Sequence, residues 1–405
     1  MNKIQDLKFR NLLEYVIQYN DFYKKKYINL TNVCLKSISM ESVYRKLPYL
    51  CKEELIQNKN VLSLGKRIVR SNTTSGSSGQ VLVCYKSLEE NIRFANRVWK
   101  LRKKIDSLVS FDNYVDLFSD EVESLIGHFY TTDKQDLIVN YNKVMSLNPR
   151  WISGPISLIE KFAVLLRNGE LEYIPTTLKY IEFMGEYVDI ETRKFIEEEF
   201  GCKTINHYGM QEVWCIAYDC LDQHLHILND NFIIEIKNPD SNGFGEVVLT
   251  SLDSFSMPFI KYCTGDIGKI YELECKYEKT PVLILRNGRK SAEIYGKNII
   301  GGYLFDQIIW DVNESFPDSI FAYQVIQNAP RLFTFKIVKG SRYNVDIQQI
   351  IEKRMKDEIG LNIEIVFKYY ESFSYNGKAK FTKFVSYLEY IKGVCHNEDN
   401  YFNLS

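Results

Sequence analysis

The residue types best suited to chemistry gather first in a polar loop early in the chain. The loop consists of small hydroxyl residues and glycines: Thr73, Thr74, Ser75, Gly76, Ser77, Ser78 and Gly79. Backbone N–H groups and hydroxyls in such a run can converge on phosphate oxygens, because glycine has no Cβ to block the approach. No Gly-Lys-Ser/Thr sequence follows, so the loop is not a Walker A motif. Taken alone, a flexible connector is the simpler interpretation and a phosphate cradle is the alternative.

Four motifs further along carry the carboxylates and cations that a nucleotide site needs. They read NHYGMQE at 206–212, YCTGD at 262–266, RNGR at 286–289 and NGK at 376–378. With the polar loop, and in this order, they resemble the adenylate-forming superfamily of acyl-CoA synthetases and ligases, and within it the phenylacetate–CoA ligase and capsule-biosynthesis-like branch. The sequences LPYLCKEEL at 47–55, VLTSL at 248–252 and MPFIKY at 257–262 extend the likeness, which covers about 47–378.

This resemblance implies that residues of the motifs bind ATP. The loop 73–79 would hold the β- and γ-phosphates, where oriented N–H and O–H dipoles stabilise charge as pyrophosphate forms. Asp266 would accept from both ribose hydroxyls, and Tyr208, next to Gly209, would stack on adenine. Further nucleotide contacts are implied for Gly185, Glu186 and Arg289. Core packing for Tyr208 and an exposed turn for Arg289 are the simpler alternatives.

The same resemblance implies a catalytic pair and a substrate pocket. Glu212 would bind Mg²⁺, a hard cation that prefers carboxylate oxygens, although a lone glutamate is more often a solvated surface acid. Lys378 would reach the bond that forms between the substrate carboxylate and the α-phosphorus, with Lys380 and Lys383 as competing assignments. The acid substrate would face His128, Tyr130 and His207, although a lone histidine is more often structural.

A metal site is a separate question. Relatives in this branch can carry a Cys/His zinc site, and Cys220, His226 and Cys275, with His224 beside them, are the candidate ligands here. The paired C-x-C that would complete such a site is absent, which leaves Cys275 alone in its segment. Buried thiols without a metal are therefore the expectation, and zinc is the alternative.

The implied activity is ATP-dependent activation of a carboxylic acid to an acyl-adenylate, with release of pyrophosphate. The acyl group would then pass to a thiol such as coenzyme A or carrier-protein phosphopantetheine. An amide-forming or acyl-protein ligase would use the same adenylate, and a degenerate nucleotide-binding module is the alternative outside catalysis. The expected partners are a small carboxylic acid and, as acceptor, an acyl carrier protein or an amine, in a monomer or homodimer.

Three departures from the family pattern are visible. Gln80 and Val81 replace the Lys or Thr and the Pro that usually follow the loop, which leaves phosphate neutralisation to Mg²⁺ and Lys378. The sequence KSAE at 290–293 lacks the Asp expected shortly after Gly-Arg, so the hinge between the two domains is uncertain in position. Cys263 also stands where relatives often place Arg, and the sequence does not explain this change.

The elements that must position these residues are predicted from hydrophobic spacing. Apolar residues at helical intervals predict a helical lead-in over 7–27, and alternating helical and strand patterns over 87–201 indicate α/β layers. Period-two patterns predict strands at 232–236, 245–249 and 259–262. The C-terminal part predicts strands at 321–326, 332–338 and 363–369 and a helix at 345–359 that Gly360 ends.

The fold class is therefore α/β, with a large N-terminal domain of α/β layers plus a β-rich subdomain and a small mobile α+β C-terminal domain. We expect the ATP- and carboxylate-binding domain to span 1–290 and the domain with the catalytic lysine to span 291–405. The chain contains 51 Lys and Arg residues and 52 Asp and Glu residues. Its net charge is therefore too small to attract nucleic acid or anionic lipid to the protein as a whole.

The location of the protein is also an expectation from sequence. The start MNKIQDLKFR lacks the apolar stretch of a signal peptide, and no run of about 18 apolar residues occurs. The nine cysteines form no C-x-x-C motif, which is typical of a reduced compartment. We therefore expect a cytoplasmic protein that makes no contact with membranes or nucleic acid.

Overall fold

The computed structural model of the protein describes residues 1–30, 39–58, 62, 68–73, 82–118, 131–289, 293–297, 299–373 and 383–391. The chain divides into two compact units. The first comprises Met1–Gly76, Val81–Leu108 and Ile205–Leu285. The second comprises Ser77–Gln80, Val109–Thr204 and Arg286–Ser405. Each unit interleaves distant parts of the sequence, so each is described by itself.

Short helices open the first unit: α1 (Lys3–Tyr19), α2 (Asp21–Lys26), the 3-10 turn η1 (Ile28–Leu30), α3 (Met40–Lys46) and α4 (Lys52–Gln57). Asn2 begins α1 with a capping box, in which its side chain accepts from the N–H of Gln5 and the Gln5 side chain accepts from the N–H of Asn2. Phe9, Leu12 and Val16 lie buried on one face of α1, which confirms the predicted helical lead-in. This face packs against strand residues of the same unit.

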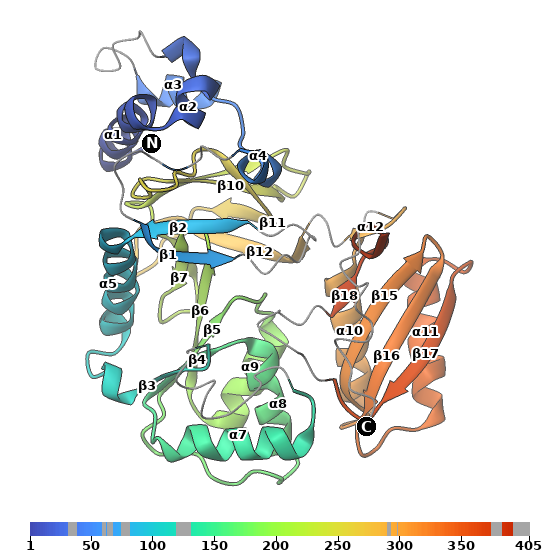
Figure 1. Ribbon diagram of the computed structural model, residues 1–405. Coiled ribbons are helices and arrows are strands. Elements are labelled where there is room, and N and C mark those ends of the chain that lie inside the picture. The colour runs from blue at the N-terminus through green and yellow to red at the C-terminus, as the bar shows by residue number, and fades with distance from the viewer. Residues whose placement is uncertain are drawn as a thin grey trace. The chain divides into compact units, whose positions relative to one another are not determined.

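A mostly antiparallel sheet forms the body of the first unit (Figure 1). Its strands lie in the order β6 (Lys203–Met210), β7 (Trp214–Asp219), β8 (Leu225–Ile227), β12 (Val282–Arg289), β11 (Tyr262–Tyr271), β10 (Gly245–Ser251) and β9 (Phe232–Lys237). A separate hairpin pairs β1 (Ile68–Thr73) with β2 (Val83–Ser87), and α5 (Leu88–Ile105) follows at once, capped by Ser87. The predicted strands at 232–236 and 245–249 are confirmed as β9 and β10.

The predicted strand at 259–262 is wrong in its bounds, because β11 begins only at Tyr262 and continues to Tyr271. Lys261 has φ of 51°, in the left-handed region, so the extended backbone cannot start before the next residue. The motif at 262–266 therefore lies at the start of a strand, where sequence pattern alone placed an end.

Parallel strands and helices alternate in the middle of the second unit. The strands β3 (Tyr114–Asp116), β4 (Trp151–Gly154) and β5 (Tyr180–Met184) pair in parallel in that order, after the 3-10 turn η3 (Phe111–Asn113). The helices α7 (Lys134–Ser146), α8 (Ile156–Arg167) and α9 (Ile190–Phe200) surround a core that includes Phe162, Phe183 and Ile196. These layers confirm the predicted α/β alternation.

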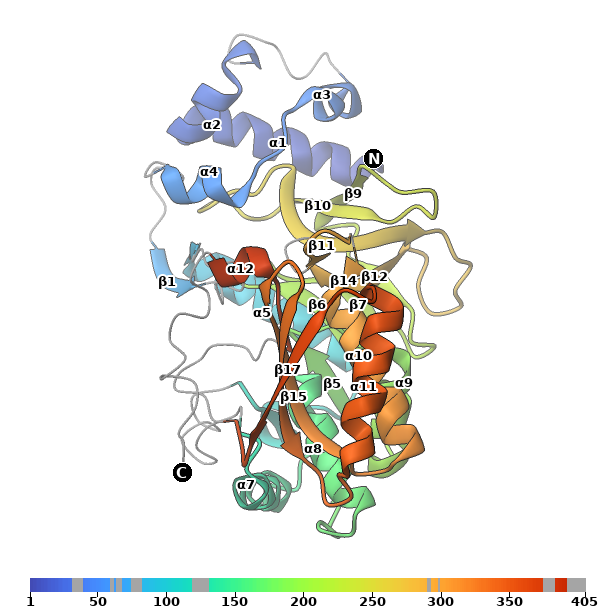
Figure 2. The same cartoon turned by 90° about the vertical axis from the view of Figure 1, so that its right-hand side faces the viewer.

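The C-terminal segment of the second unit is a small α+β structure. A four-stranded sheet has the order β17 (Glu364–Tyr370), β16 (Leu332–Lys339), β15 (Ile320–Ala329) and β18 (Phe384–Val385). The helices α10 (Gly301–Ser315) and α11 (Val345–Ile359) run side by side and share one apolar core with this sheet (Figure 2). A short hairpin of β13 (Glu293–Ile294) and β14 (Ile299–Ile300) precedes α10, and α12 (Tyr387–Ile391) follows β18.

The predicted elements of this segment are confirmed. Strands β15, β16 and β17 and helix α11 lie where hydrophobic spacing placed them, and Gly360, at φ of 132°, ends α11. The fold class is α/β, with a large sheet and a small C-terminal α+β part. The boundary at 290/291 stays a prediction. Within the described residues, no helix combines the length and the apolar character that crossing a membrane requires.

Candidate functional site

Two of the predicted nucleotide-binding side chains touch each other in the first unit. Tyr208 lies on β6 and Asp266 lies on β11, and the Tyr208 hydroxyl donates to Oδ2 of Asp266 at 2.8 Å. The hydroxyl of Thr264 lies 3.1 Å from the backbone N–H of Asp266 and accepts its hydrogen bond. Gly265, at φ of 80°, allows the chain to turn between these two residues. Residues 58 positions apart in sequence therefore present one ring and one carboxylate at a single place.

Glu212 is buried in the turn that joins β6 to β7. Its carboxylate oxygen Oε1 accepts from the hydroxyl of Tyr262 at 3.1 Å, and only 6% of the residue is exposed. Burial, followed by the charge of Glu212, raises the pKa of Cys84 on β2 to about 12. The carboxylate thus stands close to β2 and to the first residue of β11. Glu212 is no solvated surface acid, which removes the simpler interpretation of this residue.

Lys86 is a functional candidate that sequence reasoning missed. It lies on β2, 3% exposed, and its Nζ donates to the carbonyl oxygen of Gln211 at 2.6 Å. A buried cation therefore borders the turn that carries Glu212. No spacing rule marks Lys86, because its partner is more than a hundred residues away. Tyr262 was missed for the same reason, although it begins the conspicuous motif that carries Asp266.

The neighbouring residues Gly209 and His207 have packing roles. A Cβ on Gly209 would lie 2.5 Å from the carbonyl oxygen of Trp214, so the close approach of β6 and β7 requires glycine here. The His207 ring packs edge-on against Tyr218 at 5.7 Å between centroids. Contact of His207 with a substrate stays a prediction.

Gly185 and Glu186 lie in the second unit, directly after β5. Gly185 has φ of 82°. The Glu186 carboxylate accepts from the backbone N–H of Ser157 at 2.9 Å and from its hydroxyl at 3.0 Å. Glu186 therefore satisfies an otherwise free N–H in the first turn of α8, where a negative charge is also favoured by the helix dipole. Its predicted contact with nucleotide stays a prediction.

The remaining predicted residues are described in part or not at all. Thr73 ends β1 and Arg289 ends β12, and only their backbones are described. The other predicted residues lie outside the described residues: Thr74, Ser75, Gly76, Ser77, Ser78, Gly79, His128, Tyr130 and Lys378.

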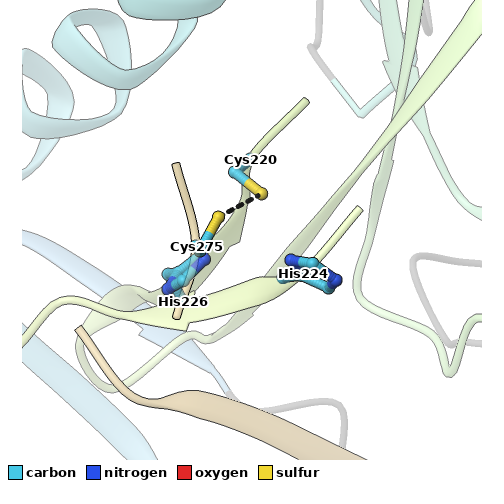
Figure 3. Close-up of side chains that lie close together, drawn as sticks. All are labelled: Cys220, His224, His226 and Cys275. Carbon is cyan, nitrogen blue, oxygen red and sulfur yellow. Dashed lines mark hydrogen bonds between the residues drawn. The ribbon is translucent and has the colours of Figure 1, made fainter. Parts of the chain in front are cut away.

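Cys220, His224, His226 and Cys275 form a compact cluster in the first unit (Figure 3). One donor atom from each lies within 4.8 Å of the others, and the two sulfur atoms are 3.7 Å apart. Cys220 follows β7, the histidines lie at β8, and Cys275 comes from the segment between β11 and β12. The tertiary structure thus brings all four candidate donors together, although the sequence lacks a second cysteine near Cys275.

The chemistry of the four donors fits Zn²⁺. His226 Nδ1 lies 2.7 Å from the carbonyl oxygen of Thr280, which can only accept, so Nδ1 carries the proton and Nε2 keeps a lone pair. Two ring nitrogens, Nε2 of His226 and Nδ1 of His224, are buried without a hydrogen-bond partner in the described part of the chain. The side chain of His224 is the main cause that lowers the pKa of Cys275 to about 6. Zinc-binding histidines typically donate their second ring N–H to a backbone carbonyl, and zinc-binding cysteines are deprotonated. Both features are present here.

Parts of this chain are similar to known proteins. A family model described as the CapK C-terminal domain matches residues 295–384. A phenylacetate-coenzyme A ligase of Thermus thermophilus is 27% identical over 149 residues, which are 34% of this chain and 34% of that protein. The aligned region therefore spans only about a third of this curated relative.

Solved structures match over nearly the whole chain. A 2-hydroxyisobutyryl-CoA ligase in complex with 2-HIB-AMP gives a TM-score of 0.72 at 13% identity, covering 97% of this chain and 90% of that one. The chain therefore has the fold of this CoA ligase. An acyl acid amido synthetase gives a TM-score of 0.59 at 12% identity, covering 91% of this chain and 86% of the synthetase. At these identities the structural matches establish the fold alone.

Proposed function

We propose that this protein is an ATP-dependent, AMP-forming ligase of the adenylate-forming type. It activates a carboxylic acid as the acyl-adenylate, releases pyrophosphate and transfers the acyl group to a thiol such as coenzyme A or phosphopantetheine. The observation that carries the proposal is the contact between Tyr208 and Asp266 on two strands of one sheet. A ring and a carboxylate so placed suit adenine and the ribose hydroxyls.

In the proposed reaction the protein acts by positioning and electrostatics. Asp266 accepts hydrogen bonds from the ribose hydroxyls. These bonds partly replace the hydrogen bond that Asp266 accepts from the Tyr208 hydroxyl. Glu212 fits a magnesium ion, because it is a buried carboxylate and because oxygen is the ligand that Mg²⁺ prefers. The bound Mg²⁺ would supply charge neutralisation at the phosphates.

The carboxylate of the substrate attacks the α-phosphorus in line, so that a new C–O–P linkage forms as the bond to pyrophosphate breaks. The loop 73–79 would stabilise the departing pyrophosphate with its N–H and O–H groups. Lys378 would offset the negative charge on the carboxylate and on the α-phosphoryl oxygens. Orientation of the two anions is the main catalytic contribution of the chain.

A panel of small carboxylic acids, assayed for acid-dependent pyrophosphate release, tests this function. We expect one class of acid to support release, and Lys378→Ala to reduce it by a factor of about 100 or more, because electrostatic stabilisation of a transition state contributes several kcal/mol. Lys380→Ala is the matched control and should keep the parent rate. Release that persists unchanged in Lys378→Ala would contradict the assignment of this lysine.

An amide-forming ligase is the second candidate, and the match to an acyl acid amido synthetase favours keeping it. The two differ only in the acceptor. With the accepted acid, coenzyme A and hydroxylamine should be supplied in turn. Formation of a thioester supports the thiol ligase, whereas trapping of an acyl hydroxamate without any thioester supports the amide-forming enzyme.

We also propose that Cys220, His224, His226 and Cys275 hold a structural zinc ion, against the expectation from sequence. The support is the convergence of four donors within 4.8 Å and the fixed tautomer of His226. The ion would tie the segment before β12 to β7 and β8. No open coordination position is needed for such a role.

A further inference from the structure

Helix α8 presents two adjacent charged residues to the C-terminal segment of the second unit. Glu160 Oε2 lies 3.9 Å from Nζ of Lys383, and Lys161 Nζ donates to the carbonyl oxygen of Phe321 at 3.2 Å. Neighbouring positions on an α-helix point about 100° apart. One short stretch of α8 therefore reaches two separate points of the segment, next to β18 and at the start of β15.

Lys383 is held firmly on its own side of this contact. Its Nζ lies 2.9 Å from Oδ1 of Asp306 on α10, and the hydroxyl of Tyr323 donates to the same oxygen at 2.6 Å. Burial works against the charge of Lys383, but the carboxylates of Asp306 and Glu160 outweigh it and hold its pKa above the usual value. Lys383 is thus a fixed cation within the segment, which argues against its assignment as the catalytic lysine.

Phe321 is held in a similar way from the other side. Its ring lies 5.2 Å from Nζ of Lys161 and 5.5 Å from Nζ of Lys134 on α7, within the range of cation–π attraction. Burial lowers the pKa of Lys161 to about 8, so its ammonium is only weakly stabilised in this place.

The apolar part of the same contact is small. Phe321, Ala322, Val338 and Phe373 join the core formed by α7, α8 and α9. Phe373 also exchanges hydrogen bonds with Thr132, which lies just before α7. In sequence, Lys378 is five residues after Phe373 and five residues before Lys383. Phe373 and Lys383, which flank Lys378 in sequence, therefore both contact the α/β layers.

We propose that Glu160 and Lys161 are positioning residues, which fix the C-terminal segment in one docked arrangement through Lys383 and Phe321. This inference rests on the proposed function, in which Lys378 must be placed for one half-reaction and the acceptor must enter for the other. The Glu160–Lys383 pair is about a third exposed and long at 3.9 Å, so it contributes little to overall stability. Its role is to select an arrangement of the segment.

The test uses the full chain with Glu160→Gln and, separately, Lys161→Met. Pyrophosphate release and acyl transfer from preformed adenylate are measured as two half-reactions. We expect their ratio to change at least threefold in each variant, and Lys161→Arg to restore the parent ratio. Glu199→Gln is the matched control, since Glu199 on α9 pairs at 2.7 Å with Arg167, which lies on α8 like Glu160, and both residues belong to the α/β layers.

A second measurement does not depend on activity. Hydrogen exchange of the backbone amides in β15 should accelerate in Glu160→Gln and Lys161→Met but not in Glu199→Gln. Unchanged exchange, or half-reactions that fall in parallel, would overturn the positioning role. If no acid supports pyrophosphate release, the proposed function fails while exchange in β15 still decides whether these two residues hold the segment.

Discussion

At the scale of single residues, the site depends on side chains whose partners are remote in sequence. Tyr208 and Asp266 meet across a sheet, Glu212 meets Tyr262, and each contact joins two separate motifs. These contacts place motifs that are ambiguous one by one at a single site. Each contact can be tested by substituting one residue.

Asp266 is the residue whose loss should weaken ATP binding most specifically. For Asp266→Ala we expect the KM for ATP to rise by a factor of about 10 to 100, because hydrogen bonds to a charged acceptor contribute about 1.5–3 kcal/mol each. Steady-state kinetics at saturating acid measure this. Tyr208→Phe is the matched control, because it removes only the hydroxyl that bonds to Asp266 and keeps the ring. An unchanged KM in Asp266→Ala would contradict the ribose assignment.

The Cys/His cluster predicts a metal content. Protein purified under reducing conditions without chelator should contain about one zinc ion per chain, because four donors complete a tetrahedral site. Elemental analysis by mass spectrometry should find the ion lost in Cys275→Ser and kept in Cys202→Ser, since Cys202 is not among the four clustered residues. A strong chelator should lower the melting temperature of the parent and leave that of Cys275→Ser unchanged. Metal-free parent protein would refute the zinc proposal.

At the scale of elements, local sequence signals and tertiary contacts act together on α8. Its N-cap residue is Pro155, which provides no side-chain hydrogen bond, and the acceptor comes instead from Glu186 beyond β5. The helix lies within the region 87–201, where alternating helical and strand patterns predict α/β layers. The residue that completes its first turn could not be predicted, because it lies 29 residues from Ser157.

Glu186 should therefore matter for stability before it matters for ATP. Glu186→Ala should reduce the free energy of unfolding by about 1 kcal/mol, the usual cost of a lost helix cap. Urea denaturation followed by circular dichroism measures the change. Glu186→Gln, which retains an acceptor oxygen, should recover part of the loss. Equal stability of all three proteins would show that the bonds to Ser157 contribute nothing.

Helix α10, in contrast to α8, was not predicted from the sequence. Its first two residues are Gly301 and Gly302, which local rules assign to a turn. A Cβ on Gly301 would collide with the Phe384 ring, so close packing against β18 accounts for the first glycine. The strands β15 to β17, by contrast, carry apolar patterns that made them predictable.

At the scale of the whole molecule, the chain has two compact units with separate apolar cores. One core includes Leu13 and Leu249 of the first unit, and another includes Ile159 and Phe183 of the second. Separate cores of this size argue against a single two-state transition. The units are interleaved in sequence, so no simple truncation isolates either one.

Differential scanning calorimetry should accordingly resolve more than one transition. Leu13→Ala should lower one transition and Ile159→Ala another, because each removes buried methyl groups at a cost of about 2–5 kcal/mol. Each residue is at most 1% exposed, so the two substitutions are matched in burial. A single transition that both variants shift equally would mean that the two cores unfold together.

The sequence by itself determined the fold class, the superfamily resemblance and most strands and helices, because hydrophobic period and turn chemistry are local properties. It also singled out Asp266, Tyr208, Glu212 and the four candidate metal donors. Only the tertiary structure decided that Glu212 is buried beside Tyr262, that Glu186 caps α8, and that the four Cys and His donors converge. These facts depend on which residues distant in the chain become neighbours, and that information lies in the packing of strands and helices rather than in any short motif.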